Sequence, residues 1–420
     1  MKHEGSEGEQ QVRQPMLSVE EAQERVLSAF DLLDAERVPI LEATGRVLAE
    51  DVHAGQDIPP FANSSMDGYA VRAVDTLGGG PETPVSLRIA GELPAGSVPE
   101  RPVTQGTAIR IMTGAPLPPG ANAVVKVEDT EVQGGHVRVF AAVAPATYVR
   151  PAGEDVREGS LVLHRGTRLR PQEVGMLAAL GHEEVCVTRR PRVAILATGD
   201  ELVAIDEPPA PGKTRNANSY SNAAQVIDHG AVPILLGIAR DKVDELTTKI
   251  RAGLEQEVDL LLTSGGVSVG DLDLVKDVLA EQGQIDFWRV RMKPGKPLAF
   301  GHIGGVPVLG LPGNPVSVMV SFEMFVRPAL MTMHGDRDWR RPTVDATLMD
   351  EIKHKDERRH FVRARLVWDD GEYHAHLTGA QGSGILSSMV KANALVIIPE
   401  EWDHAPVGAR VQVMMLECNA

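Results

Sequence analysis

Cysteine is nearly absent from this chain of 420 residues, which contains only Cys186 and Cys418. Two cysteines so far apart do not make a disulfide framework, and they do not supply the clustered thiolates of a cysteine zinc site. Aromatic residues are also scarce, at 4% of the chain. This scarcity disfavours a protein that stacks the bases of single-stranded nucleic acid on aromatic rings.

The chain also lacks an excess of positive charge and a long apolar run. Lys and Arg number 42 against 58 Asp and Glu, which gives a formal net charge of −16. Binders of nucleic acid or anionic membranes generally show a basic face, so we expect neither partner. No apolar stretch reaches the roughly 18 residues needed to cross a bilayer. Residues 1–15 are polar and predict a disordered tail rather than a signal peptide, so we expect a soluble cytoplasmic protein.

The remaining residues divide into parts of different texture. Ser18 and Glu21 form a capping-box pattern ahead of an apolar helical face, and short alternating runs make about 50–165 β-rich. Farther along, strands that are apolar on both faces alternate with helices, as in a parallel sheet covered by helices. We therefore predict an α/β multidomain protein. Its parts are a tail at 1–15, a β-rich N-terminal and linker region at 16–188, a three-layer αβα domain with a mainly parallel sheet at 189–332, and a small β-barrel-like domain at 333–420.

Three turns follow predicted strands of the αβα domain. They are "ATGDEL" at 197–202, "TSGGVSVGD" at 263–271 and "LPGNPVS" at 311–317. In a parallel sheet such turns lie at one edge, where ligands bind, and the helix that follows a turn offers unpaired N–H groups to an anion. Taken alone, each turn is better explained by Gly and Pro making a tight bend. The three together favour a binding site for an anionic ligand.

The segment "FWRVRMKPGKP" at 287–297 concentrates positive charge. If 287–293 is one strand, Arg289, Arg291 and Lys293 share a face, and Lys296 follows the Pro-Gly turn. Four cations so close together make a local positive site in a negative protein, which suits a phosphorylated or oxyanionic ligand. A solvated charged strand is the alternative.

Several loops carry carboxylates that could act on such a ligand. In "PPFANSSMDGYAVRA" at 59–73, turn residues alternate with packing residues, and Asp67 is the candidate functional residue, with an Asx turn as the alternative. Scattered carboxylates beside a cationic strand are typical of a site that holds a polyanion through both Lys/Arg and Mg²⁺. The candidate carboxylates are Asp67, Asp155, Asp200, Glu201, Asp241, Asp271 and Asp273.

These segments, with "IRIMTGAPLPPGANAVV", "RPAGEDVREG" and "MKPGKPLAFG", resemble in order and spacing the molybdopterin molybdenumtransferase (MoeA) family, which includes the E domain of gephyrin and its plant counterpart. The resemblance covers about residues 16–415. It implies an enzyme that takes adenylylated molybdopterin and molybdate, releases AMP in an Mg²⁺-dependent step and leaves molybdenum on the dithiolene. It also implies a homodimer whose active cleft lies between the molybdopterin-binding domain of one protomer and the N-terminal region of the other. The upstream molybdopterin adenylyltransferase is a candidate partner.

The resemblance, carried over motif by motif, and the strand-end turns together give three sets of expected functional residues. The catalytic set is Asp67, Thr113, Asp155, Glu201, Asp241 and Asp273. The set that binds the pterin substrate and molybdate is Arg150, Thr198, Ser264, Gly265, Gly266, Ser268, Arg289, Lys293, Lys296, Pro297, Pro312, Gly313, Asn314, Pro315, Arg363 and Ser383. The metal set is Glu201, Asp271 and Asp273. Two positions depart from the family pattern. Ala62 stands where many members carry an acid, and Arg289 stands where a Lys is common.

Two alternative functions belong to other classes. One is a non-catalytic molybdopterin-binding scaffold, as the E domain of gephyrin is when it clusters receptors. The other is a nucleotide-amide or pyrophosphate hydrolase that shares only the αβ domain. The retained carboxylates argue against the scaffold, and "NSSMDGYA" and "MTGAP" argue against the hydrolase.

Overall fold

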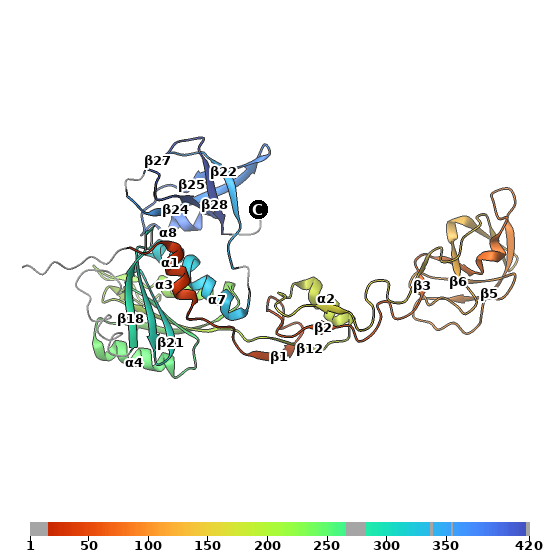
Figure 1. The fold of residues 1–420 in the computed structure, drawn as a ribbon, viewed down its shortest axis with the longest axis horizontal. Helices are drawn as coiled ribbons and strands as arrows, with labels where there is room; N and C mark the ends of the chain where they lie inside the picture. Colours follow the sequence, from red (N-terminus) through yellow and green to blue (C-terminus); the bar gives the residue numbers. More distant parts are fainter. Residues whose placement is uncertain (1–15, 266–282, 337–338, 354–355, 417–420) are drawn as a thin grey trace, which may run out of the picture. The chain divides into compact units, whose positions relative to one another are not determined.

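The structure is a computed structural model that describes residues 16–265, 283–336, 339–353 and 356–416 (Figure 1). The chain forms two compact units. The larger unit consists of Met1–Glu36, Gly45–Val47 and Val187–Ala420, and the smaller of Arg37–Thr44 and Leu48–Cys186. The predicted architecture is confirmed: a β-rich N-terminal region, an αβα domain and a C-terminal barrel are all present.

A six-stranded sheet in the order β16-β13-β17-β21-β20-β18 forms the centre of the larger unit. Its first four strands are parallel, and β20 and β18 add to them in antiparallel fashion. The strands are β13 (Arg192–Thr198), β16 (Val232–Ala239), β17 (Leu260–Ser264), β18 (Gly283–Arg289), β20 (Pro297–Ile303) and β21 (Val306–Leu311).

Helices cover both faces of this sheet because its strands are apolar on both sides. Val193 and Ile195 of β13 pack into a cluster with residues of α3 (Asn218–Asp228) and α6 (Pro315–Ser321). The alternate residues Ala194 and Leu196 pack into a second cluster with α4 (Val243–Leu254). The helices α3 and α4 thus cover opposite faces of the sheet, which is the predicted three-layer arrangement.

One long helix passes through the core of the larger unit. It runs through α6, the π-helical segment η3 (Phe322–Val326) and α7 (Arg327–His334) without a break. Among the described residues it is the one helix long and apolar enough to cross a membrane, but 89% of its apolar window is buried inside the protein. The helix therefore packs as a core element.

The helix α1 (Val19–Leu27) also belongs to the larger unit, although the sequence places it before the β-rich region. The predicted capping box is present: the Glu21 N–H donates to Ser18 Oγ at 3.1 Å, and the Ser18 N–H donates to Glu21 Oε2 at 2.7 Å. Val19 and Val26 are buried in the same cluster as β13 and α6. From its position in the sequence we expected this helix to belong to the N-terminal region. Its apolar face instead packs on the αβα domain.

The C-terminal strands close into a five-stranded barrel. They follow the order β24-β25-β22-β28-β26, and pairing between β24 and β26 closes the ring. The strands are β22 (Thr343–Leu348), β24 (Arg359–Asp369), β25 (Glu372–Leu377), β26 (Ala394–Ile398) and β28 (Arg410–Met415). A short strand from the αβα domain, β19 (Met292–Lys293), pairs with β24 in parallel and joins the two domains.

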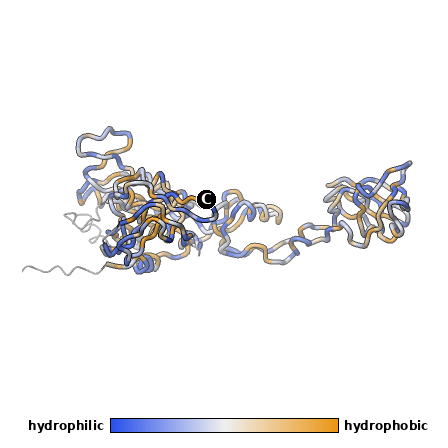
Figure 2. The backbone as a smooth tube through the Cα atoms, turned by 90° about the horizontal axis from the view of Figure 1, so that it is seen from above, coloured by the Kyte–Doolittle hydropathy of each residue, from blue (hydrophilic) through white to orange (hydrophobic). Residues whose placement is uncertain are grey.

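The smaller unit is built on a second six-stranded sheet, with strand order β7-β4-β6-β5-β9-β8. Apolar and polar stretches alternate over short distances along it (Figure 2), as expected for short strands between polar turns. The strands are β4 (Gly68–Val71), β5 (Val85–Leu93), β6 (Thr107–Ile111), β7 (Ala123–Lys126), β8 (Thr130–Gln133) and β9 (His136–Val139). The same unit holds α2 (Pro171–Ala179) and the strand pairs β2 (Val52–His53) with β11 (Leu161–Leu163) and β3 (Asn63–Ser64) with β10 (Val149–Arg150).

Candidate functional site

The carboxyl ends of β13, β17 and β21 open into a cavity of about 1050 Å³. The first and third predicted turns line this cavity, and of the second turn the described residue Gly265 does so. Gly265 is held where only glycine fits. Its φ is +96°, and a Cβ would lie 2.5 Å from the carbonyl oxygen of Thr198. The Gly265 N–H donates to the Leu311 carbonyl at 3.1 Å, and the Cα of Gly265 lies close to Gly313. Glycine thus allows the three strand ends to approach closely.

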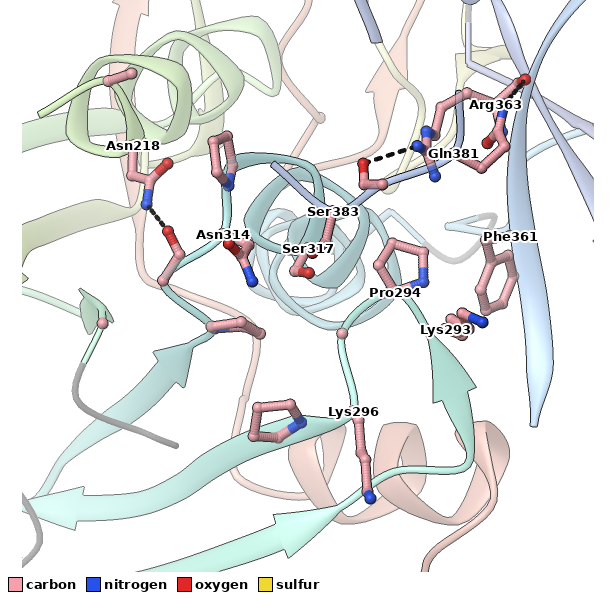
Figure 3. A pocket seen from close by; sticks show the side chains of 18 of the residues that line it. Asn218, Lys293, Pro294, Lys296, Asn314, Ser317, Phe361, Arg363, Gln381 and Ser383 are labelled. Atoms are coloured by element: carbon pink, nitrogen blue, oxygen red, sulfur yellow. Dashed lines mark hydrogen bonds between the residues drawn. The ribbon is translucent and has the colours of Figure 1, made fainter. Parts of the chain in front are cut away.

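The C-terminal barrel supplies the opposite wall of this cavity. Barrel residues lie around the same hollow as the turn at Asn314 (Figure 3). The Val316 N–H donates to the Ser383 carbonyl at 3.0 Å, which ties the start of α6 to the barrel. The lining residues from the barrel side are Glu351, Ile352, Lys353, Arg358, His360, Phe361, Val362, Arg363, Leu377, Gln381, Gly382 and Ser383.

Most of the predicted ligand-binding residues in the larger unit line this cavity. They are Thr198, Glu201, Asp241, Gly265, Lys293, Lys296, Pro297, Pro312, Gly313, Asn314, Pro315, Arg363 and Ser383. Ser264 lies just behind the wall at 2% exposure, and its hydroxyl has no hydrogen-bond partner among the described residues. Gly266, Ser268, Asp271 and Asp273 lie outside the described residues.

The cavity wall is positive although the protein is negative. Six Lys or Arg residues and three carboxylates line it, so the formal balance of the described wall is +3. The cations are Arg215, Lys293, Lys296, Lys353, Arg358 and Arg363, and the carboxylates are Glu201, Asp241 and Glu351. A concave surface with one sign of charge concentrates ligands of the opposite sign.

Arg363 is the most buried of these cations, at 1% exposure. Its Nε donates to Ser388 Oγ at 3.1 Å and its Nη2 donates to the Gly382 carbonyl at 3.0 Å. Within the described part of the chain no carboxylate pairs with it, and burial lowers the pKa of its guanidinium. A buried cation with neutral partners alone is unfavourable, so the site gains stability when an anion enters.

The cationic segment at 287–297 is not one strand as expected. β18 ends at Arg289, Val290 forms a parallel bridge with Leu17, and β19 then joins the barrel. Arg289 and Arg291 do not line the cavity, whereas Lys293 and Lys296 do, on the two sides of the turn at Pro294 (Figure 3). Buried and charged residues still alternate, because Val290 and Met292 are buried. The break in the strand after Arg289 changes which of the cations face the cavity.

Asp200 does not line the cavity itself, but it contacts Asp241, which does. The carbonyl oxygen of Asp200 accepts from Lys213 Nζ at 2.5 Å and from Arg240 Nη1 at 3.1 Å, and its Oδ1 accepts from the Asp241 N–H at 3.3 Å. Glu201 folds its carboxylate over Gly199, where a Cβ would overlap it. No cluster of three His, Cys, Asp or Glu occurs among the described residues. Glu201 and Asp241 nevertheless give the cavity two hard oxygen donors, which fits Mg²⁺ because that ion completes its shell with water and phosphate.

The start of α6 differs from the expected anion site. Pro315 has no N–H, and the N–H of Val316 is already donated to Ser383. The Val318 N–H is donated to Asn314 inside the helix. The amides of Val316 and Val318 are therefore already used and are not available to an anion. Asn218 supports the turn by donating from Nδ2 to the Gly313 carbonyl at 2.7 Å (Figure 3).

Two predicted catalytic residues of the smaller unit contact each other. The N–H and Oγ1 of Thr113 donate to Asp67 Oδ1 at 2.7 and 2.8 Å. These bonds, the N–H first and the hydroxyl second, lower the pKa of the Asp67 carboxyl. Asp67 is therefore held by another loop, and the Asx-turn alternative does not describe it.

The other two predicted residues of the smaller unit lie in the loop after β10. Arg150 Nε lies 3.8 Å from Glu154 Oε2. Asp155 lines a hollow of about 720 Å³ formed by residues 151–162, and its N–H donates to the Ile58 carbonyl at 3.0 Å. The side chains of Arg150 and Asp155 are both exposed.

Sequence reasoning missed the barrel cations Lys353 and Arg358 and the α3 residue Asn218. The run "DERRHFVRAR" at 356–365 is a charged stretch whose strand period gave no indication of which residues face a ligand. Lys353 and Arg358 reach the cavity only because the barrel closes against the αβα domain.

A strand-edge cavity with a positive wall, closed by a β barrel, defines a class of protein that binds small anionic ligands at the carboxyl ends of a parallel sheet. Family models match along the chain: the MoeA N-terminal region (domains I and II) at 17–181, a probable molybdopterin binding domain at 194–332 and the MoeA C-terminal region (domain IV) at 345–416. The chain belongs to the MoeA family of molybdopterin molybdenumtransferases.

Individual relatives match over nearly the whole length. Molybdopterin molybdenumtransferase 2 of Mycobacterium tuberculosis is 39% identical over 404 residues, covering 95% of this chain and 99% of the relative. The molybdopterin molybdenumtransferase of Bacillus subtilis is 34% identical over 405 residues, with 95% and 94% covered. The crystal structure of a molybdopterin biosynthesis MoeA protein from Pyrococcus horikoshii has a TM-score of 0.82 at 32% identity, covering 96% of this chain and 100% of that one.

Proposed function

We propose that this chain is a transferase of molybdenum cofactor biosynthesis that inserts molybdenum from molybdate into adenylylated molybdopterin and releases AMP. The observation that carries the proposal is the positive cavity at the strand ends, with the buried Arg363 on its wall. Both substrates are anions, and the relatives with the same domain series are named molybdopterin molybdenumtransferases. A non-catalytic scaffold is not favoured by those names.

Molybdate, a tetrahedral dianion, is the substrate for the cationic corner of the cavity. Lys293 and Lys296 flank the turn at Pro294, and the barrel adds the buried guanidinium of Arg363. A planar guanidinium and an ammonium pair offer several charged donors to one oxyanion. Pro297 and Ser383 complete this corner, together with Ser268 as implied by the family resemblance.

Adenylylated molybdopterin takes the remaining space. The cavity of about 1050 Å³ is at the upper end of small-molecule sites. The turns at Thr198, Gly265 and Gly313 receive the phosphate end of the pterin, since glycine lets the ligand approach the backbone there. This placement leaves the dithiolene free to meet molybdate near the lysines.

Glu201 and Asp241, with Asp271 and Asp273 as implied by the resemblance, would hold Mg²⁺ against the phosphoanhydride. The ion would supply positive charge to the phosphate oxygens as the anhydride bond breaks. The residues of the chain act by electrostatics: Lys293, Lys296 and the buried Arg363 offset the negative charge of the leaving phosphate.

We also propose a role for the N-terminal region in the active cleft. The resemblance implies that Asp67, Thr113, Arg150 and Asp155 contribute to the active cleft of a homodimer from the partner protomer. The bond pair between Thr113 and Asp67 fixes one carboxylate in an ionised form suited to that role. We further propose a cytoplasmic location and the molybdopterin adenylyltransferase as the supplier of substrate.

The direct test incubates the protein with adenylylated molybdopterin, Mg²⁺ and molybdate. AMP and a molybdenum-bearing pterin are expected in equal amounts, and pterin binding without AMP release would indicate the scaffold instead. Lys296→Ala is expected to weaken molybdate binding about tenfold, equivalent to about 1.4 kcal/mol. Lys249→Ala, on α4 across the sheet, is the matched control and should bind molybdate as the parent protein does.

A further inference from the structure

Asp356, in the segment that leads into β24, lies at the centre of a cluster of cationic side chains. Its Oδ2 is 3.3 Å from Lys293 Nζ. Arg358 binds both carboxylate oxygens, with Nε to Oδ1 at 2.8 Å and Nη2 to Oδ2 at 2.9 Å. His360 Nε2 is 3.0 Å from Oδ1. One carboxylate of the barrel therefore neutralises a lysine of the αβα domain that lines the cavity.

The arrangement is the one that an oxyanion would adopt among the same donors. The hydrogen bonds from Arg358 hold the pKa of Asp356 far below its usual range, against the opposing effect of burial, so the group is ionised at neutral pH. Lys293, Arg358 and His360 all line the cavity, whereas Asp356 does not. The carboxylate therefore contacts three groups of the cavity wall without itself lining the cavity.

The contacts of Asp356 with Arg358 and with Lys293 differ in strength. Its pair with Arg358 is bidentate, a geometry that favours a lasting contact. Its pair with Lys293 is a single contact at 3.3 Å with a lysine side chain that is 47% exposed. Such half-exposed lysine pairs are weak, because solvent screens them and the long side chain loses freedom. Lys293 can therefore exchange partners while Asp356 stays with Arg358.

We propose that Asp356 is a displaceable counter-ion of Lys293 and sets the affinity of the cavity for its oxyanion substrate. Before the anion enters, the ammonium of Lys293 turns to Asp356. When a tetrahedral dianion enters, it takes the ammonium from the carboxylate, and the lost pair lowers the net gain of binding. The inference rests on the proposed molybdate site and assigns Asp356 a positioning role through Lys293.

The test measures molybdate binding by equilibrium dialysis and molybdate-dependent AMP release. Asp356→Asn is expected to tighten molybdate binding about three- to tenfold. The KM for molybdate should fall by a similar factor, while kcat stays within about twofold. In a Lys293→Ala background the same substitution should change the affinity by a smaller factor than in the parent protein, because one of the cations that Asp356 pairs with is gone.

Glu351→Gln is the matched control. Glu351 lines the same cavity and pairs with Lys353 at 2.9 Å, so its removal changes the charge equally without touching Lys293. Equal tightening by both variants would show a general field effect and overturn the inference, as would weaker or unchanged binding in Asp356→Asn. Thermal unfolding monitors folding, and Asp356→Ser replaces Asp356→Asn if the latter does not fold.

Failure of the inference is distinguishable from failure of the proposed function. A parent protein that transfers molybdenum, with an Asp356→Asn variant that binds no more tightly, overturns the counter-ion alone. A parent protein that neither binds molybdate nor releases AMP overturns the proposed function and the inference together.

Discussion

Arg363 shows at the residue scale how this fold prepares for an anion. Its guanidinium is buried and fixed by Ser388 and Gly382, neither of which is charged. Ordering an arginine side chain costs conformational freedom, and here that cost is met during folding rather than on binding. The side chain is thus in position before the substrate arrives.

The bond between Thr113 and Asp67 gives the first residue-scale prediction. Thr113→Val removes the hydroxyl donor and keeps the N–H donor, so the pKa of Asp67 should rise part of the way toward the ordinary carboxyl range. Because the folded-state pKa is depressed, the bond stabilises the protein above the ordinary pKa and is lost as the pH falls through the folded value. The difference in stability between parent and variant should therefore vanish in acid.

Nuclear magnetic resonance titration of the Asp67 carboxyl carbon checks this shift. Thr113→Ser keeps the hydroxyl and serves as the control. The expected role of Thr113 is wrong if Asp67 titrates at the same pH in all three proteins.

At the scale of elements, the π-helical segment η3 places a buried carboxylate beside two arginines. Glu323 accepts from Arg341 Nε and Nη2 at 3.0 Å each, and Arg327 Nε lies 3.1 Å away. Burial alone raises the pKa of Glu323, but the contacts of His229, Arg341 and Arg327 outweigh it and lower the pKa to about 2. This cluster fastens the long core helix to the segment that enters the barrel.

Glu323→Gln should lower the free energy of unfolding by about 3 kcal/mol at neutral pH, because it leaves buried arginine charge uncompensated. The folded pKa of the carboxyl is depressed, so its contribution is present above about pH 4.5 and is lost as the pH falls toward 2. Urea unfolding of both proteins across this range measures the difference. A difference that does not change with pH would contradict the charge-based account. Glu24→Gln, exposed on α1, is the control.

The turn after β17 gives a second prediction at this scale. Gly265→Ala should cost about 3 kcal/mol or more, because a Cβ at φ +96° meets the Thr198 carbonyl as well as the strain of a positive φ. Gly212→Ala is matched, since Gly212 has φ +78° and open space around it, and should cost about 1 kcal/mol. Chemical denaturation compares the two. Equal costs would show that backbone conformation alone, and not the close approach of strands, requires glycine at 265.

At the scale of the whole molecule, the proposed homodimer predicts a result that can be tested only by mixing two variants. Asp67→Asn disables the N-terminal region, and Lys293→Ala disables the cavity. If each active cleft combines the N-terminal region of one protomer with the cavity of the other, a mixed dimer has one intact site. Random mixing of the two inactive proteins should then restore about a quarter of the parental AMP release.

Mixing after mild denaturation and refolding, followed by the AMP assay, measures this recovery. Lys293→Ala mixed with Lys296→Ala is the control, since both changes lie in one cavity and no intact site forms. No recovery in the first mixture, in dimers shown by ultracentrifugation to have exchanged, would place the whole site within one chain.

Much of the fold followed from local pattern, and its exceptions have a common cause. β13 was predictable because six consecutive buried residues leave no polar face. The helix α1 was predictable as a helix but not in its location, since Leu17 pairs with Val290, far away in sequence. The same pairing broke the expected strand at 287–293 and kept Arg289 away from the cavity. Long-range pairing leaves no periodic signal in the segments that it joins.

The amino-acid sequence alone determined the order of strands and helices, the glycine turns at strand ends, the excess of negative charge and the family resemblance. These depend on side-chain type and short spacing, which act over one or two turns of chain. The tertiary structure decided which cations share a cavity, that Arg363 is buried with neutral partners and that Asp356 reaches Lys293. Those facts arise from packing a barrel against a sheet edge, where residues distant in sequence are brought within hydrogen-bond range.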